Sequence, residues 1–223
     1  MQLRFEAECT SEVYVREEGW KRATLEACPV HSDGTCGLRR LGTYPRVKPP
    51  GTRIARFYCP TGRFTISLLP DCFASRWSGD LDAIEEVVVV AEAAPSIEAA
   101  ADVLRPDITL TSAVRWIRRR LRPVRRFGVL VKGLLPDRVA SWPPTMSGLR
   151  AALATHSALV TLRGLTADRL HLLPSPAGFG PRSEGSGGRS SAREHEVGAV
   201  PPGAVVVAPS SPASAGSTKE NTT

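Results

Sequence analysis

Apolar and polar positions change their spacing along this chain of 223 residues. In the first third, short runs rich in β-branched and aromatic residues alternate with turn sequences, and they predict strands at 38–44, 53–59 and 64–69. The alternating residues 2–16 predict a further short hairpin. From residue 80 onward, apolar residues recur every three or four positions, which is the spacing of amphipathic helices. The pattern therefore predicts an α+β chain with its strands first.

Two helices are expected in succession after the strands. Asp80 can cap a helix that ends before Pro95, and Ser96 can cap a shorter, alanine-rich helix that ends before Pro106. Residues 147–165 are expected to form one last amphipathic helix.

Between these helices lies the stretch 111–126, which carries the main functional signal. At 100° per residue its apolar residues fall on one side of a helix, and five arginines fall on the other. These are Arg115, Arg118, Arg119, Arg122 and Arg126. Pro123 is expected to kink this helix or to start a new one. Closely spaced guanidinium groups repel one another, so the face indicates a polyanionic partner, although a solvated basic face without a ligand gives the same pattern.

The distribution of charge supports a local binding surface. The formal net charge is +7, and residues 100–135 alone hold nine bases and two acids, which gives the same net value. Residues 175–223 hold four bases and four acids, and their high content of Gly, Pro, Ser and Ala predicts a disordered tail. The excess positive charge is therefore concentrated on the basic helix, as expected for a nucleic-acid-binding protein.

The sequence contains neither an apolar run long enough to span a membrane nor a signal peptide at its start. We therefore expect a cytoplasmic protein without a membrane partner. In a reducing compartment its five cysteines favour metal binding or buried thiols over disulfides. Cys9 is expected to be structural. Cys72 is expected to be a buried thiol, with a substitute metal ligand as the alternative.

Four residues of the β-rich part form a candidate metal site. Cys28 and His31 have the spacing that lets side chains of a tight turn converge, Cys36 follows, and Cys59 ends a strand. Three sulfurs and one imidazole suit tetrahedral Zn²⁺, and four protein ligands leave no open position, so the role would be structural. No CxxC is present, and Gly62 stands where a second knuckle would offer a cysteine. A ribbon that has lost its metal is therefore the alternative.

These motifs resemble the zinc-ribbon plus helix-turn-helix module of bacterial insertion-sequence transposases and related stand-alone proteins. The residues that carry the resemblance are Cys28-Pro29, Gly42–Arg46, Arg56–Cys59, Thr65–Pro70 and the basic helix. It covers about residues 27–122, and it implies double-stranded DNA as the partner and transposon-end or operator recognition as the function. A homodimer is a candidate assembly, because such modules often bind two half-sites.

No catalytic residues are expected. The part after Leu135 is too short for the ribonuclease-H-like domain of a transposase, and the chain has no phosphate-binding Gly-rich loop, HExxH helix or GxSxG turn. We therefore expect a DNA-binding protein in which ribbon arginines hold the phosphate backbone; they are Arg39, Arg40, Arg46, Arg53 and Arg56. The alternative is a protein-interaction module or a decayed transposase fragment with a solvated basic helix.

The expected architecture has four parts. A degenerate zinc ribbon of β structure spans 1–75, and an all-α helix-turn-helix bundle spans 76–135. A helical extension follows over 136–174, and the disordered tail spans 175–223.

Overall fold

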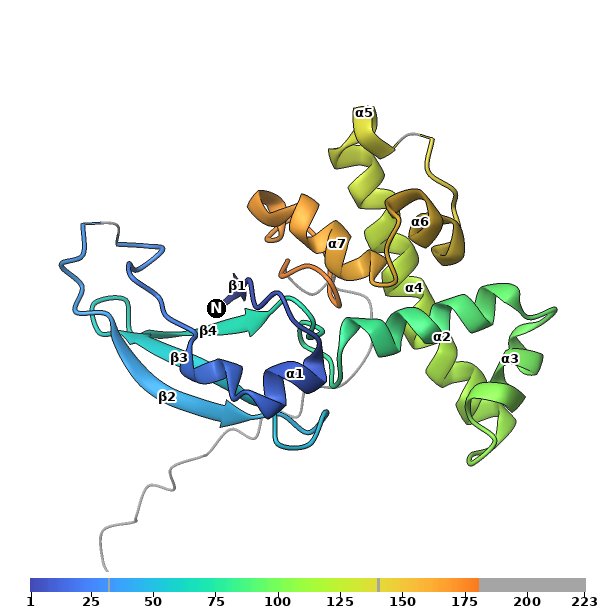
Figure 1. Ribbon diagram of the computed structural model, residues 1–223, viewed down its shortest axis with the longest axis horizontal. Coiled ribbons are helices and arrows are strands. Elements are labelled where there is room, and N and C mark those ends of the chain that lie inside the picture. Colours follow the sequence, from blue (N-terminus) through green and yellow to red (C-terminus); the bar gives the residue numbers. More distant parts are fainter. Residues whose placement is uncertain (32, 140, 181–223) are drawn as a thin grey trace, which may run out of the picture. The chain divides into compact units, whose positions relative to one another are not determined.

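The computed structural model describes residues 1–31, 33–139 and 141–180, and all of them belong to one compact unit, Met1–Gly185. The architecture is α+β, as the sequence predicts, with a four-stranded sheet in the N-terminal part and helices after it (Figure 1). Within the described part, no helix is both long enough and apolar enough to cross a lipid bilayer.

The sheet has the strand order β1-β4-β3-β2. Its strands are β1 (Gln2–Phe5), β2 (Arg39–Pro45), β3 (Arg53–Cys59) and β4 (Phe64–Pro70). β2, β3 and β4 pair antiparallel and confirm the three strands expected from the alternating pattern, whereas β1 pairs parallel to β4. A bulge interrupts the pairing of β2 with β3 between Arg40 and Gly42.

The expected hairpin over residues 2–16 is wrong. β1 pairs with the distant β4, and residues Ser11–Arg16 form the helix α1. The Thr10 hydroxyl accepts a hydrogen bond from the backbone N–H of Val13, so the polar residues Cys9–Glu12, expected as the turn of that hairpin, contain the start of a helix. The 3₁₀ turn η1 (Gly19–Lys21) follows.

The two faces of the sheet bury different clusters. Ile54 and Leu69 pack with Tyr14 of α1, Trp20 of η1 and Phe73. The Tyr14 ring meets Trp20 and Phe73 edge to face, with centroids 6.0 and 5.4 Å apart, and its hydroxyl donates to the backbone oxygen of Arg53. The second cluster contains three of the cysteines with apolar residues of β3 and β4; it comprises Ala23, Cys28, Cys36, Ala55, Phe57, Cys59, Ile66 and Leu68.

Two of the helices begin at the caps expected from the sequence. α2 (Leu81–Ala93) starts after Asp80 and α3 (Ile97–Leu104) after Ser96, and both cap side chains accept a backbone N–H of the first turn. α4 (Leu110–Leu134) comes next. The remaining elements are α5 (Pro136–Val139), α6 (Met146–Leu153), α7 (Ala158–Leu165) and the 3₁₀ turn η2 (Ala167–Arg169).

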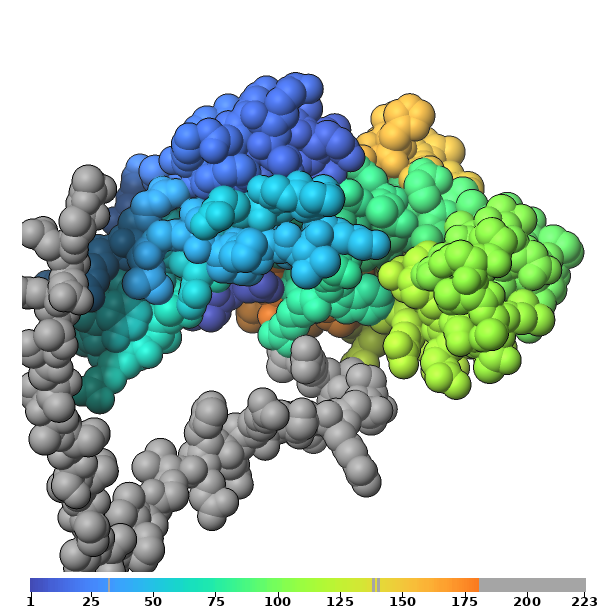
Figure 2. All heavy atoms as spheres, turned by 90° about the horizontal axis from the view of Figure 1, so that it is seen from below, coloured from blue at the N-terminus to red at the C-terminus, as the bar shows by residue number. Residues whose placement is uncertain are grey.

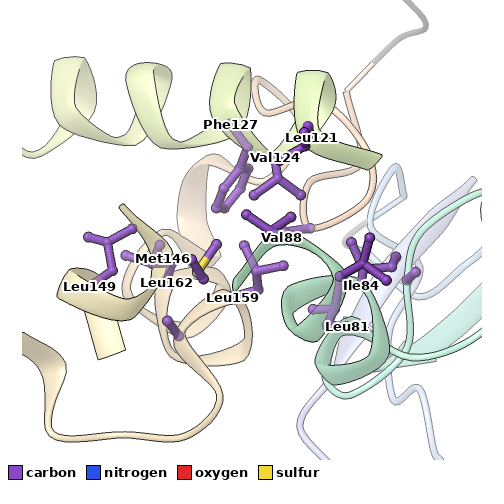
Figure 3. Packing of buried hydrophobic residues seen from close by; sticks show 14 of the residues in the cluster. Leu81, Ile84, Val88, Leu121, Val124, Phe127, Met146, Leu149, Leu159 and Leu162 are labelled. Atoms are coloured by element: carbon purple, nitrogen blue, oxygen red, sulfur yellow. The ribbon is translucent and has the colours of Figure 1, made fainter. Parts of the chain in front are cut away.

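Helix α4 passes through Pro123 without a break, so the expectation that a new helix starts there is wrong. Its apolar side belongs to the helical core, where Leu121, Val124 and Phe127 face residues of α2, α6 and α7 (Figure 3). Proline has no N–H, so one backbone hydrogen bond of the helix is lost at Pro123. Burial of the apolar residues, which are spaced three or four positions apart on both sides of it, stabilises the helix there.

The single helix expected over 147–165 is also wrong, because the chain breaks between α6 and α7. Ala154 adopts a left-handed conformation after α6, with φ 49°. The fully buried carboxylate of Glu85 on α2 accepts the N–H groups of Ala158 and Leu159, at 3.0 and 2.8 Å, and the guanidinium of Arg150 at 2.5 Å. An acidic side chain from α2 thus satisfies the free donors at the start of α7.

A buried arginine joins the sheet to the helices. Arg163 of α7 is 0% exposed, and its Nη1 donates to the carbonyl oxygens of Asp71 and Phe73, both at 2.8 Å, just after β4. Its Nε and Nη2 donate to the carbonyl oxygens of Ala177 and Pro176, at 2.7 and 2.9 Å. One side chain therefore holds the end of the sheet and the segment after η2 against α7.

The expected disordered tail lies mostly outside the described residues, since 181–223 are not described. Its predicted start at Ser175 is wrong, however. Ala177 is fully buried, and the N–H of Phe179 donates to the carbonyl oxygen of Leu170 at 2.7 Å. The contacts with Arg163 fix these residues, and the composition of the segment does not reveal that distant partner.

Replacement of Arg163 tests this junction. Arg163→Met keeps most of the side-chain volume but leaves the buried carbonyl oxygens of Asp71, Phe73 and Ala177 without a hydrogen-bond donor among the described residues, so we expect the free energy of unfolding to fall by about 3–5 kcal/mol. The exposed Arg118→Met on α4 is the matched control and should change it by less than ~0.5 kcal/mol. Both are measured by urea denaturation. Equal stabilities of the two variants would show that Arg163 does not hold the junction.

Candidate functional site

The structure brings Cys28, His31, Cys36 and Cys59 together, as the sequence predicts. One potential ligand atom from each residue lies within 4.8 Å of the others. The imidazole Nδ1 is 3.5 Å from the sulfur of Cys28 and 3.4 Å from that of Cys59. All three cysteines are buried, and His31 is half-buried. The four residues can bind a metal ion.

Strand β3 and its turn position one end of this cluster. Cys59 is the last residue of β3, and the N–H of Gly62 donates to its sulfur at 3.3 Å in the turn toward β4. A Cβ at position 62 would lie 2.2 Å from the ring of Phe64 and 3.3 Å from Cε1 of His31. Glycine therefore fits where a second knuckle would place a cysteine, and Cys36 supplies the third sulfur instead.

The loop between η1 and β2 supplies the other three members of the cluster. Burial raises the pKa of Cys28, but hydrogen bonds from the backbone N–H groups of Val30 and His31 and from the His31 ring outweigh it and lower the pKa to about 6. Cys36 receives a backbone hydrogen bond from Leu38, although burial raises its pKa. Each sulfur thus has a backbone amide donor nearby, and the lowered pKa of Cys28 favours its thiolate, which is the form that binds metals.

The remaining two cysteines lie outside this cluster. Cys72 is buried beside Tyr14 and Phe73, and burial raises its pKa well above the ordinary value. This position agrees with the expected buried thiol and not with a substitute ligand. Cys9 is half-buried in the same region.

The arginine face of α4 is exposed. All five predicted residues are accessible to solvent, namely Arg115, Arg118, Arg119, Arg122 and Arg126. The segment that holds α3 and the first half of α4, coloured light green, lies at the molecular surface in Figure 2. Among the described side chains none of the five forms an ion pair, whereas neighbouring Arg125 lies 3.7 Å from the carboxylate of Glu92.

Two further arginines beside this face were not among the predicted residues. The guanidinium carbon of Arg120 lies 3.7 Å from the ring centre of Trp116, and that of Arg105 lies 5.1 Å from it. Burial lowers the pKa of Arg120 to about 10, with Arg105 and Arg119 adding to the effect, so the group remains charged at neutral pH. The i,i+4 spacing of Trp116 and Arg120 was the available signal, because such pairs meet on one face of a helix.

The five arginines predicted to hold the phosphate backbone fall into two groups. Arg40 donates to the carbonyl oxygens of Trp20 and Ala23, and Arg46 donates to three carbonyl oxygens in the stretch 74–79, so both hold loops of the fold. The other three lie on the sheet, with the guanidinium carbons of Arg39 and Arg56 5.7 Å from the rings of Tyr58 and Tyr44 and Arg53 donating to Thr43.

A comparison of this chain with protein-family models, curated proteins and solved structures finds no significant match in any of the three. The resemblance to transposase modules therefore rests on the motif residues alone, and any function has to be inferred from the side chains of this chain.

Proposed function

We propose that this protein binds double-stranded DNA through the arginine face of α4. The observation that carries the proposal is the exposure of five arginines on one side of a helix, with no ion-pair partner for any of them among the described residues. The opposite side is buried in the helical core. Phosphates of a duplex supply a row of negative charges that such a face can neutralise.

The order of the helices is compatible with a helix-turn-helix mode of binding. α2, α3 and α4 pack on one another through a shared core, which includes Ala100 and Ala101 of α3 and Ala113 and Ile117 of α4. In this mode α4 would serve as the recognition helix in the major groove. The connection between α3 and α4, residues 105–109, is longer than the usual tight turn of the motif.

The half-buried arginines beside Trp116 favour a contact at the phosphate backbone. Arg105 is paired with Asp107 at 2.7 Å, whereas Arg120 donates only to the carbonyl oxygen of Trp116 among the described residues. Arg120 is held against the indole ring, so little side-chain entropy remains to be lost when it meets an anion. On the ribbon, only Arg39, Arg53 and Arg56 remain as candidates for phosphate contacts.

Neutralisation of the arginine face tests DNA binding. For Arg119→Gln combined with Arg122→Gln we expect weaker binding to a mixed-sequence 30-base-pair duplex. The slope of log K against log salt should become shallower by about 0.9 for each phosphate that the variant no longer neutralises. Fluorescence anisotropy over a range of KCl concentrations measures both quantities.

The matched control is Arg16→Gln, which removes an exposed arginine of α1 that pairs with Glu17 and lies outside α4. It should bind as the wild type does. If the wild type does not bind the duplex even at low salt, the proposal fails. The basic face would then be a surface for an acidic protein partner, or solvated.

We infer further that the cysteine–histidine cluster binds Zn²⁺ in a structural role. Three sulfurs and one imidazole within 4.8 Å of one another match the donors and the size of a tetrahedral zinc site. Such an ion would link the loop between η1 and β2 to the end of β3. It would add stability to a sheet that is too small to bury much apolar surface by itself. Four protein ligands leave no position for a substrate, so no catalysis is assigned to this site.

Metal analysis tests this inference. We expect one zinc per chain by inductively coupled plasma mass spectrometry, and loss of the metal in Cys59→Ser together with loss of protection of the sheet amides in hydrogen exchange. Cys9→Ser is the matched control, because it removes a cysteine outside the cluster and should keep the metal. Purified wild-type protein without zinc, still folded and unchanged by EDTA, would contradict a structural zinc site.

A further inference from the structure

A cavity of about 520 Å³ lies within the helical part, apart from the metal centre. α2, α4, α6, α7 and the loop before α6 line it, and its apolar walls include Val88, Val124, Trp142, Met146, Leu149 and Leu162. In Figure 3, Val88, Val124, Met146 and Leu162 lie in the space between the helices. The volume falls within the range of small-molecule sites in proteins, which are mostly apolar with a few placed polar groups.

Helix α4 forms one wall with a glycine at its centre. Val124, Gly128 and Lys132 are four residues apart and all line the cavity, so position 128 lies in the middle of the lining stripe. A Cβ built at Gly128 meets no atom within 4 Å. Glycine inside a helix lowers stability by about 1 kcal/mol relative to alanine, and no close neighbour here requires it. Because Gly128 has no side chain, the space beside it remains part of the cavity.

The polar groups of the cavity have more free donors than free acceptors. Glu92 is largely buried, and its carboxylate accepts the N–H of Met146 at 2.7 Å and lies 3.7 Å from Arg125. The ammonium of Lys132 donates one hydrogen bond, to the carbonyl oxygen of Trp142 at 2.8 Å, and keeps two N–H groups. The guanidinium of Arg125 is 61% exposed and keeps most of its donors. Arg125 and Lys132 carry two positive charges and Glu92 one negative charge, so the net charge beside the apolar space is positive.

We propose that this cavity binds a small organic anion with an apolar, aromatic body. The body packs against Trp142, Met146 and Leu149, and the carboxylate or sulfonate group lies beside Arg125 and Lys132. Charge complementarity selects an anion over a cation, because Glu92 already accepts a backbone hydrogen bond and faces an arginine. This site is separate from the DNA-binding face, and it does not depend on DNA binding.

The test uses 1-anilinonaphthalene-8-sulfonate, an aromatic sulfonate, and the uncharged N-phenyl-1-naphthylamine as paired probes for the full-length protein. We expect saturable binding of the sulfonate with energy transfer from tryptophan. Gly128→Leu fills the cavity and should weaken binding of both probes roughly tenfold. Gly133→Leu is the matched control, since Gly133 also lies in α4 with no atom within 4 Å of its Cβ but does not line the cavity, and it should bind as the wild type does.

Charge is tested separately by Arg125→Gln. It should weaken the sulfonate roughly threefold and leave the uncharged probe unchanged, as expected for a partly exposed ion pair. Amide chemical-shift mapping on the wild type gives a readout that needs no variant, with shifts expected at Val88, Gly128 and Met146. Equal affinities of Gly128→Leu and Gly133→Leu, shifts spread over the sheet, or no saturable binding would each overturn the proposal.

Discussion

The buried guanidinium of Arg163 is the interaction on which the contact between the sheet and the helices depends. Its donors reach carbonyl oxygens after β4 and in the segment 176–177, which are far apart in sequence. Burial lowers its pKa to about 10, so the group remains charged at neutral pH. A buried charge is tolerated only where polar groups surround it, and here carbonyl oxygens from two separate segments do so. Directional hydrogen bonds therefore position the sheet against the helices, in addition to the apolar contacts.

Local sequence signals were sufficient for much of the fold and for the metal cluster. Strands β2 to β4 and the caps of α2 and α3 follow from alternation and from single side chains near the element ends. The four candidate ligands were recognised because their donor chemistry is specific, even without a CxxC. The parallel pairing of β1 with β4 was missed because it joins residues more than sixty positions apart. The break between α6 and α7 was missed because its partner, Glu85, lies on α2.

The roles of the arginines were the hardest feature to predict from the sequence. Periodicity located the five exposed members of α4, because helix geometry alone sets their direction. It could not separate them from Arg40 and Arg46, which donate to carbonyl oxygens of distant loops, or from Arg163. A guanidinium in a sequence is equally suited to phosphate, carboxylate and backbone oxygen. Only the position of the acceptor in the folded chain decides which it binds.

The bulge in β2 has a consequence for how this protein can associate with itself. β2 is an outer strand of the sheet, and its free edge could template the addition of a strand from another molecule. The irregular register between Arg40 and Gly42, the exposed Arg39 and the proline at position 45 all oppose such growth. The opposite outer strand, β1, has only four residues. These features discourage aggregation through the edges of the sheet.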